Sequence, residues 1–236
     1  MITKLDLTIA NAYLLEADRL VLVDTGGPSS EGRLLHALKQ RGIRPQDIAL
    51  ILHTHGHGDH VGSSAYLQQT FGIPVALHTA DHIMAQEGKN QPFYYSRLRS
   101  RLIAPFVSRP FQPFTPDIAI DADFSLRDFG VPARIIPTAG HTPGSVSLVF
   151  DSGEAIVGDI LMGGHLGGSI QPTAPRYHYF YDSLPQLHTS LQHLLDEGVS
   201  RFYVGHGGPL ERDAVLHWVL RQSPALVQTA LSLSRS

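Results

Sequence analysis

Four histidines and one aspartate lie within eight consecutive residues of this chain, in the stretch HTHGHGDH at positions 53–60. Imidazole and carboxylate groups bind divalent ions such as zinc, manganese and iron, so their crowding is typical of a metal site. Glycines at positions 56 and 58 let the backbone turn tightly between the candidate ligands. The chain contains no cysteine, so any metal must be held by nitrogen and oxygen atoms. The stretch therefore indicates one part of a metal site rather than a solvated histidine-rich loop.

The other candidates stand directly after apolar segments that predict buried strands. The full set is Asp24 after LVLV, the 53–60 stretch after IALIL, His141 after RIIPTAG, Asp159 after AIVG, and His206 after FYVG. Loops that leave strand ends in an α/β protein gather at one edge of the sheet, where sites form. We therefore expect residues that are far apart in the sequence to converge on one site.

Hydrophobic periodicity and turn residues predict alternating strands and helices. A hairpin is expected to run from residue 11 to Asp24, and helices are expected over residues 30–41, 62–72, 79–88, 183–197 and 213–222. Residues 89–116 break this rhythm with prolines, aromatic residues and arginines, and we interpret them as an inserted cap over the site. The sequence shows no repeat and no linker, so residues 1–236 are expected to form a single α/β domain.

The composition is that of a soluble globular protein, since 42% of the 236 residues are hydrophobic and 17% are charged. A net charge of −3, without a long basic run, argues against a nucleic-acid partner. The sequence has no apolar run of membrane-spanning length, and its first twenty residues lack the apolar core of a signal peptide. We therefore expect a cytoplasmic protein with a small-molecule substrate and no membrane partner. The oligomeric state is open, with a homodimer as one alternative.

HTHGHGDH together with AGHTPGS, GDI and VGHGGP resembles the metallo-β-lactamase superfamily of metallo-hydrolases. The stretch NAYLLEADRLVLVDTGG is similar to the opening hairpin of that family, so the resemblance covers nearly the whole chain. It implies an αββα four-layer sandwich with the metal site at one edge of the two sheets. This position agrees with the placement of the candidates after predicted strands.

The resemblance also implies a ligand set for two divalent ions. His55, His57 and His141 would bind the first ion, Asp59, His60 and His206 would bind the second, and Asp159 would bridge them. Asp24 matches an aspartate that usually supports the ligands from behind, and His53 is expected to do the same. Zn²⁺ is the ion that we expect first, with Mn²⁺ and Fe²⁺ as alternatives.

Two ions in such a site hold a bridging water and lower its pKa from about 15.7 towards neutrality. The resulting hydroxide attacks an electrophilic carbonyl or phosphorus, and Asp59 is expected to move a proton as well as to bind metal. True β-lactamases of this superfamily generally lack the bridging aspartate, so Asp159 favours the branches that resemble glyoxalase II and the lactonases. Only thirty residues follow His206, so we do not expect the helical glutathione-binding domain of glyoxalase II itself.

The predicted function is hydrolysis of a small-molecule ester, lactone or thioester by a binuclear metal site. A phosphodiesterase or phosphotriesterase on the same site is one alternative. A persulfide oxygenase with a single iron is another, and a metal-bound sensor without turnover is a third. Each of these alternatives uses some or all of the same ligands.

Substrate contacts are expected from two further segments. His165 lies six residues after Asp159 in the glycine-rich stretch MGGHLGG. In RYHYFY, Arg176 is a candidate partner for an acidic substrate group. The phenols of Tyr177, Tyr179 and Tyr181 are candidates for a hydrogen bond to the developing oxyanion, as in related lactonases. Ordinary packing is the alternative for this aromatic run.

Overall fold

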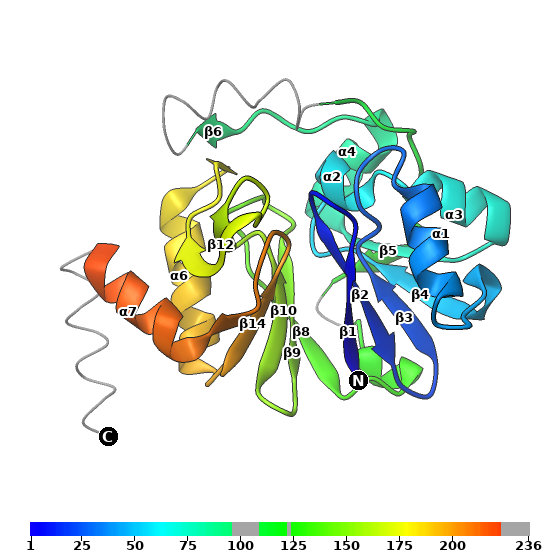
Figure 1. Cartoon of the computed structure of the whole chain (residues 1–236). Helices are drawn as coiled ribbons and strands as arrows, with labels where there is room; N and C mark the ends of the chain where they lie inside the picture. Colours follow the sequence, from blue (N-terminus) through cyan, green and yellow to red (C-terminus); the bar gives the residue numbers. More distant parts are fainter. Residues whose placement is uncertain (96–108, 122–123, 223–236) are drawn as a thin grey trace.

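A computed structural model describes residues 1–95, 109–121 and 124–222 of the chain. Within these residues, two main sheets face each other (Figure 1). The first has the strand order β1 (Ile2–Asp6), β2 (Asn11–Glu16), β3 (Leu20–Val23), β4 (Ile48–Leu52), β5 (Val75–His78) and β7 (Ile118–Ile120). The second has the order β15 (Leu210–Glu211), β14 (Arg201–Val204), β10 (Glu154–Gly158), β9 (Val146–Phe150) and β8 (Ala133–Pro137).

Helices cover the outer face of each sheet (Figure 1). Those on the first sheet are α1 (Glu31–Lys39), α3 (Ser64–Phe71) and α4 (His82–Glu87), and those on the second are α6 (Leu184–Asp196) and α7 (Arg212–Gln222). Short 3₁₀ turns lie at Pro45–Asp47, Thr79–Asp81 and Leu126–Phe129. The predicted αββα four-layer sandwich is therefore confirmed. In the described part of the chain, no helix has the length and apolar character needed to cross a membrane.

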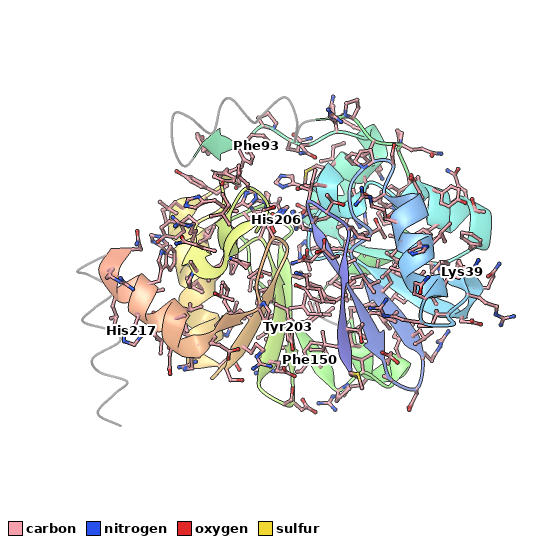
Figure 2. The ribbon with its side chains drawn as sticks, viewed as in Figure 1. Lys39, Phe93, Phe150, Tyr203, His206 and His217 are labelled. Carbon is pink, nitrogen blue, oxygen red and sulfur yellow. The ribbon has the colours of Figure 1, made fainter. Side chains whose placement is uncertain are left out.

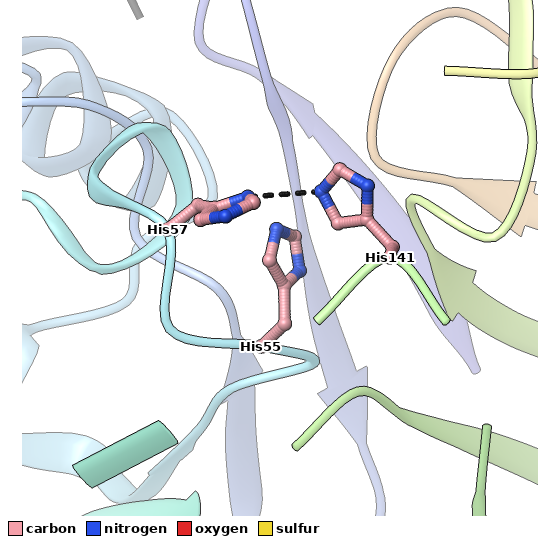
Figure 3. Close-up of side chains that lie close together, drawn as sticks. All are labelled: His55, His57 and His141. Atoms are coloured by element: carbon pink, nitrogen blue, oxygen red, sulfur yellow. Dashed lines mark hydrogen bonds between the residues drawn. The ribbon is translucent and has the colours of Figure 1, made fainter. Parts of the chain in front are cut away.

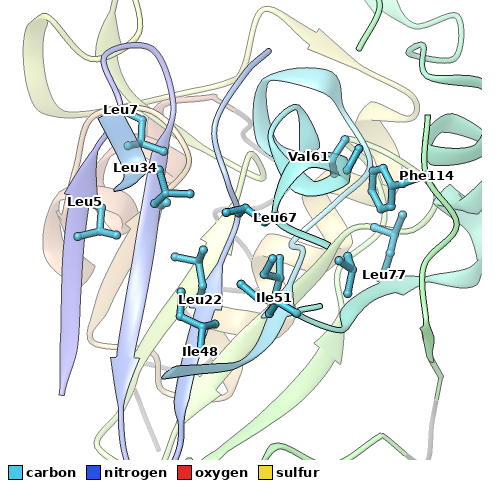
Figure 4. Close-up of a cluster of buried hydrophobic side chains, with 14 of the residues drawn as sticks. Leu5, Leu7, Leu22, Leu34, Ile48, Ile51, Val61, Leu67, Leu77 and Phe114 are labelled. Atoms are coloured by element: carbon cyan, nitrogen blue, oxygen red, sulfur yellow. The ribbon is translucent and has the colours of Figure 1, made fainter. Parts of the chain in front are cut away.

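Three apolar clusters hold the four layers together. One lies between the first sheet and its helices and includes Leu22, Leu34 and Leu67 (Figure 4). A second joins the other sheet to α6 and α7, and a third fills the space between the two sheets. Strands of both sheets are therefore apolar on both faces, which explains why runs such as IALIL lack a polar alternation. These three clusters are formed by side chains along the strands and helices, so the polar residues just beyond the strand ends are available to form a site.

The strands that precede the candidate ligands run in compatible directions. Strands β3, β4, β5 and β7 are parallel neighbours, and β10 is parallel to β14. β8 runs antiparallel to β9, which runs antiparallel to β10, so β8 and β10 point the same way. Their carboxyl ends meet at one edge of the sandwich, as the sequence predicts.

Two small strand pairs lie beside this edge. Strand β11 (Met162–His165) pairs with β12 (Ile170–Arg176), and β13 (Phe180–Tyr181) pairs with β6 (Tyr94–Tyr95) of the predicted cap. Figure 2 shows Phe93 beside β6 and His206 after β14 towards the same edge. Residues 96–108 of the predicted cap lie outside the described residues. The described flank nevertheless contacts the site, because the Phe93 ring lies 6.0 Å from the His57 ring.

The structure adds elements to the predicted ones. The helix predicted over 62–72 is present as α3, and a separate single turn of helix, α2 (Gly58–Val61), precedes it across Gly62 and Ser63. A Cβ at Gly62 would lie 2.3 Å from the backbone nitrogen of Pro28, so this close approach admits only glycine. Seven strands of the described chain were not predicted, because their pattern is weak without the neighbouring strands: β1, β6, β7, β11, β12, β13 and β15 (Leu210–Glu211). The prediction of one domain over residues 1–236 stays a prediction.

Candidate metal centre

The seven predicted ligands converge at the sheet edge. His55, His57 and His141 form one group of side chains whose ligand atoms all lie within 4.8 Å of one another. Figure 3 shows these three imidazoles converging from two loops. Asp59, His60 and His206 form a second group with the same spacing. We call these groups the first and second triplets.

Asp159 connects the two triplets. Its Oδ2 atom lies 3.5 Å from Nε2 of His141 in the first triplet and 3.5 Å from Nε2 of His60 in the second. Nε2 of His206 lies 3.2 Å from the same oxygen. A single carboxylate atom is therefore placed between the side chains of both groups.

Local sequence explains how the ligands reach these positions. His55 and His57 leave the end of β4 in an extended segment, whereas Asp59 and His60 lie on the single turn of α2. Gly205 directly follows β14, and a Cβ there would lie 2.1 Å from Oδ1 of Asp159 and 2.6 Å from Cε1 of His60. A glycine at this position therefore leaves room for the Asp159 carboxylate and the His60 ring to lie side by side.

Several polar atoms at the centre are buried and form no hydrogen bond. These atoms are Nε2 of His55, His60 and His206, and both carboxylate oxygens of Asp159. A buried polar atom without a partner costs about 1–3 kcal/mol, so a cluster of them requires an additional group. Divalent ions fit this donor set, since imidazole nitrogen and carboxylate oxygen both offer lone pairs. The cluster therefore fits divalent metal ions.

The outer nitrogen of four candidate ligand imidazoles faces an oxygen acceptor. Nδ1 of His60 donates to Oδ2 of Asp24 at 2.9 Å, and Nδ1 of His141 donates to the carbonyl oxygen of Phe180 at 3.0 Å. Nδ1 of His206 donates to the carbonyl oxygen of Ile9 at 2.6 Å, and Nδ1 of His55 contacts Oγ1 of Thr54 at 3.1 Å. In the neutral form that binds metal, each ring carries its one proton on Nδ1, so Nε2 presents a lone pair to the cluster.

His57 is oriented differently from these four rings. Its Nδ1 atom lies 2.9 Å from Nε2 of His141, as the dashed line in Figure 3 marks. The two nitrogens therefore point at the same space, which suits two ligands of one ion.

Asp24 and His53, the two predicted supporting residues, contact the candidate ligands and their loop from the buried side. Asp24 accepts hydrogen bonds from the backbone N–H and the hydroxyl of Thr54 at 2.9 and 2.8 Å. His53 contacts Asp24 at 3.3 Å and Ser64 at 2.7 Å, and it belongs to none of the candidate metal groups in the described chain. This buried network fixes His60 and the start of the ligand loop.

Asp81 is a further supporting residue, which the sequence did not indicate. Its carboxylate accepts hydrogen bonds from the N–H groups of Gly56 and Gly144 at 2.8 and 2.9 Å and from the hydroxyl of Thr142 at 2.7 Å. The 53–60 and 138–145 loops are thereby tied to one side chain. Burial raises the pKa of Asp81, against the lowering effect of these hydrogen bonds.

The pKa values of the histidines are shifted in opposite directions in the two triplets. Burial lowers the pKa of His57 to about 4, and burial followed by the nearby imidazoles lowers those of His55 and His141. Burial also acts to lower the pKa of His206, but Asp159 and Asp59 outweigh it and raise that pKa to about 10. The pKa of His60 is likewise raised, because Asp159 and Asp24 outweigh its burial.

The carboxylates of the centre show the matching effect. Burial acts to raise the pKa of both Asp59 and Asp159, but the neighbouring histidines outweigh it and lower both values. Without metal, the first triplet is therefore neutral at pH 7, whereas the second triplet consists of charge-paired histidines and aspartates.

A cavity of about 1540 Å³ opens beside the centre, and Asp59 and His206 line it. Four predicted substrate contacts also line it: His165, Arg176, Tyr177 and Tyr179. The Tyr177 hydroxyl lies 2.5 Å from Nε2 of His188, and the Tyr179 hydroxyl accepts a hydrogen bond from the N–H of Leu166 at 3.3 Å. Tyr181 is not in the described lining and packs instead against the core of the second sheet.

His178 joins the centre although the sequence analysis did not select it. Its Nε2 atom lies 3.3 Å from Oδ2 of Asp159, and it forms a candidate metal group with His141 and Asp159. The aromatic run around it is consistent with packing, and the distant ligands that surround it in space are invisible in the local sequence. A histidine at the centre of the run RYHYFY was the only available signal.

The fold and this cluster define a metal-binding α/β protein with histidine and aspartate ligands. The family model described as the Metallo-beta-lactamase superfamily matches residues 5–206. The chain therefore belongs to the metallo-β-lactamase superfamily.

Individual relatives support the same assignment. The chain is 31% identical over 161 residues to "Probable metallo-hydrolase YflN" of Bacillus subtilis, covering 65% of this chain and 61%, less than two thirds, of that protein. It is 26% identical over 202 residues to "Probable metallo-hydrolase MJ0888" of Methanocaldococcus jannaschii, covering 84% and 87%. The crystal structure of TTHA1623 in a di-iron-bound form is similar with a TM-score of 0.63 and 28% identity, covering 87% of this chain and 91% of that one.

Proposed function

We propose that this protein is a binuclear metal-dependent hydrolase of a small-molecule ester, lactone or thioester, in the branch that resembles glyoxalase II and the lactonases. The observation that carries the proposal is the position of Asp159, with one oxygen 3.5 Å from a histidine of each triplet. The names of YflN and MJ0888 as metallo-hydrolases and the two irons of TTHA1623 are consistent with it.

Each ion has a defined set of ligands in this proposal. His55, His57 and His141 would hold the first ion, Asp59, His60 and His206 would hold the second, and Asp159 would supply an oxygen between the two groups. When bound, two divalent ions supply a Lewis acid for the oxygen under attack and activate water for that attack. Zn²⁺ remains our first expectation, and Mn²⁺ or Fe²⁺ suits the same donors.

The two carboxylates have different tasks. The Asp159 side chain is fully buried, whereas the Asp59 side chain is 18% exposed and faces the cavity. Asp159 therefore fixes the two triplets relative to each other. Asp59 is the carboxylate that reaches the attacking water, and as an ionised group it accepts a hydrogen bond from that water and orients it.

The cavity is suited to a substrate that carries negative charge. Arg33, Arg109 and Arg176 line it, and Asp59 is the only acidic residue in the described lining. Nε of Arg176 is buried without a hydrogen-bond partner, and its guanidinium is otherwise held by Gln171 at 3.4 Å. A planar guanidinium with unused donors is suited to a carboxylate or phosphate. His165, Tyr177 and Tyr179 supply the remaining predicted contacts.

This cationic lining also favours a second candidate function, hydrolysis of a phosphodiester at the same centre, and a phosphotriester is its neutral counterpart. The negative charge of a phosphodiester would itself pair with the guanidinium groups. Only the substrate class differs between the two functions.

A substrate panel tests the proposal. Protein purified without chelators is analysed for metal per chain and assayed with aryl esters, lactones, thioesters, phosphodiesters and phosphotriesters. We expect close to two ions per chain and carbonyl-ester turnover that falls at least about 100-fold in Asp159→Asn. The matched control is Asp213→Asn, because Asp213 is exposed on α7. Turnover of phosphoesters alone would establish the second candidate, and one iron per chain with oxygen-dependent persulfide oxidation would refute both.

A further inference from the structure

His178 is an additional imidazole at the candidate centre, on the segment between β12 and β13. It is 6% exposed and lines the cavity. Its ring stacks on that of His206 with centroids 5.2 Å apart and meets the ring of His141 edge-on at 4.7 Å. With Nε2 only 3.3 Å from Oδ2 of Asp159, it could serve either as a further ligand or as a hydrogen-bond donor.

The partner of Nδ1 distinguishes these roles. The backbone N–H of Phe180 donates to Nδ1 of His178 at 3.3 Å. An Nδ1 atom that accepts a hydrogen bond carries no proton, so the proton of the neutral ring lies on Nε2. A nitrogen that carries this proton has no lone pair to offer a metal ion.

The candidate ligands have the opposite arrangement. The carbonyl oxygen of Phe180 accepts the Nδ1–H of His141 at 3.0 Å, which leaves Nε2 of His141 with its lone pair. Asp24 and the carbonyl of Ile9 do the same for His60 and His206. The two peptide groups of one residue, Phe180, thus orient His141 as an acceptor of metal and His178 as a donor of a hydrogen bond.

Phe180 is itself held in place. It lies on β13, which pairs with β6 in the register Phe180↔Tyr95, and its ring packs on Phe93 with centroids 4.5 Å apart. The donor direction of His178 is therefore set by the flank of the insertion. None of the three candidate tyrosines is placed at the centre in this way, because the hydroxyls of Tyr177 and Tyr179 have partners elsewhere and Tyr181 packs against the core.

We propose that His178 is a catalytic hydrogen-bond donor, whose Nε2–H points from the rim of the metal cluster at the substrate oxygen that gains negative charge during cleavage. This inference rests on the proposed hydrolase function. No proton is transferred, and the N–H bond of Nε2 stays intact throughout. The group recognised is an oxygen on trigonal carbon or tetrahedral phosphorus, held beside Asp159 and His206. A donor aimed at such an oxygen contributes about 100-fold or more to kcat.

Three substitutions separate a donor from a ligand. His178→Phe keeps an aromatic ring but removes the N–H, His178→Gln places an amide N–H near the position of Nε2, and His178→Met matches the length of Gln without a donor. His217→Gln is the control, since His217 is an exposed histidine of α7. Metal content per chain, thermal unfolding, kcat and KM are measured for each protein.

We expect wild-type metal content in all variants, kcat lowered about 100-fold in His178→Phe and His178→Met, and recovery to within about tenfold in His178→Gln. KM should change less than about threefold, because the charge appears only during cleavage. Loss of metal from the Phe and Met variants would make His178 a ligand and overturn the proposal. Unchanged kcat in both His178→Phe and His178→Met would mean that His178 only packs against its neighbours, and this result would also overturn the proposal. If the Phe variant does not fold, the Gln and Met pair decides.

A binding measurement keeps this inference separate from the proposed function. Methylphosphonate, a tetrahedral oxyanion, is titrated calorimetrically into the metal-loaded proteins. We expect binding about tenfold weaker in His178→Phe and His178→Met than in wild type, and near wild type in His178→Gln. If wild type hydrolyses no substrate, the proposed function fails and with it the catalytic role of His178, whereas this titration still shows whether its Nε2–H donates to a bound oxyanion. Equal affinity in all proteins would overturn the role.

Discussion

Asp24 accepts the Nδ1–H of His60 at 2.9 Å, while its other oxygen accepts the backbone N–H of Thr54 at 2.9 Å. One carboxylate thus sets the orientation of a candidate ligand and the start of the loop that carries two others. Groups that orient metal ligands in this way typically change metal affinity about 10- to 100-fold when they are removed.

Asp24→Ala should therefore weaken metal binding about 10- to 100-fold, because His60 loses the acceptor that keeps the proton on its Nδ1. Affinity is measured by competition with a chelator of known strength. Asp213→Ala on the exposed face of α7 should bind metal like wild type. Equal affinities for the two variants would mean that the ligand geometry does not depend on Asp24.

Asp81→Ala should destabilise the folded protein by about 3 kcal/mol, because the N–H groups of Gly56 and Gly144 would be left buried without acceptors. Urea denaturation of metal-free protein measures this loss, and Asp213→Ala again serves as the matched control. Metal affinity should fall as well, since two ligand loops lose their common anchor. A midpoint equal to that of the control would show that the loops hold their positions without Asp81.

Metal binding should release protons unequally from the two triplets. A ligand imidazole must be neutral, and burial already lowers the pKa of His57 to about 4. The pKa of His206 is raised to about 10 by Asp159 and Asp59 despite its burial, so this ring must lose a proton at pH 7 before it binds metal. Affinity for the second ion should therefore rise with pH between about 7 and 10, while affinity for the first stays nearly constant.

Calorimetric titration in buffers of different ionisation enthalpy counts the released protons for each ion. We expect nearly none for the first ion and about one to two for the second at neutral pH. Equal release by both ions would contradict the charge pattern of the two triplets.

Arg176→Met should raise KM for an ester that carries a carboxylate about 10- to 100-fold, because a charged hydrogen bond contributes about 1.5–3 kcal/mol. KM for a neutral ester of similar size should change little, so the ratio of the two values is the readout. Arg221→Met, on the exposed end of α7, is the control. A similar increase in KM for both esters would mean that Arg176 shapes the cavity instead of recognising charge.

Most core strands and helices, and the loop with the candidate ligands, are predictable because the signals for them lie within short continuous segments. Apolar runs such as IALIL ended where β4 ends, and residues after strands with a common direction had to meet at one edge. The spacing within HTHGHGDH placed four candidates on one loop. The glycine positions were likewise readable, because the turns at 56 and 58 require a backbone without side-chain clashes.

Other parts of the centre depend on contacts between distant segments. His178 precedes the short strand β13, whose pairing with β6 cannot be read from the local sequence, and only the folded arrangement brings it within 3.3 Å of Asp159. Asp81 lies in a 3₁₀ turn without a motif, and its three hydrogen-bond partners come from two loops far along the chain. The break between α2 and α3 also has a distant cause, since Gly62 packs against Gly27 and Pro28.

The central claim is that one carboxylate, Asp159, joins two metal ions. Anomalous diffraction from crystals grown with the metal that co-purifies tests it most directly. We predict two peaks about 3.5–4 Å apart, one among His55, His57 and His141 and the other among Asp59, His60 and His206, with Asp159 between them. A single peak at full occupancy in the presence of excess metal, or two peaks that Asp159 does not contact, would contradict the account.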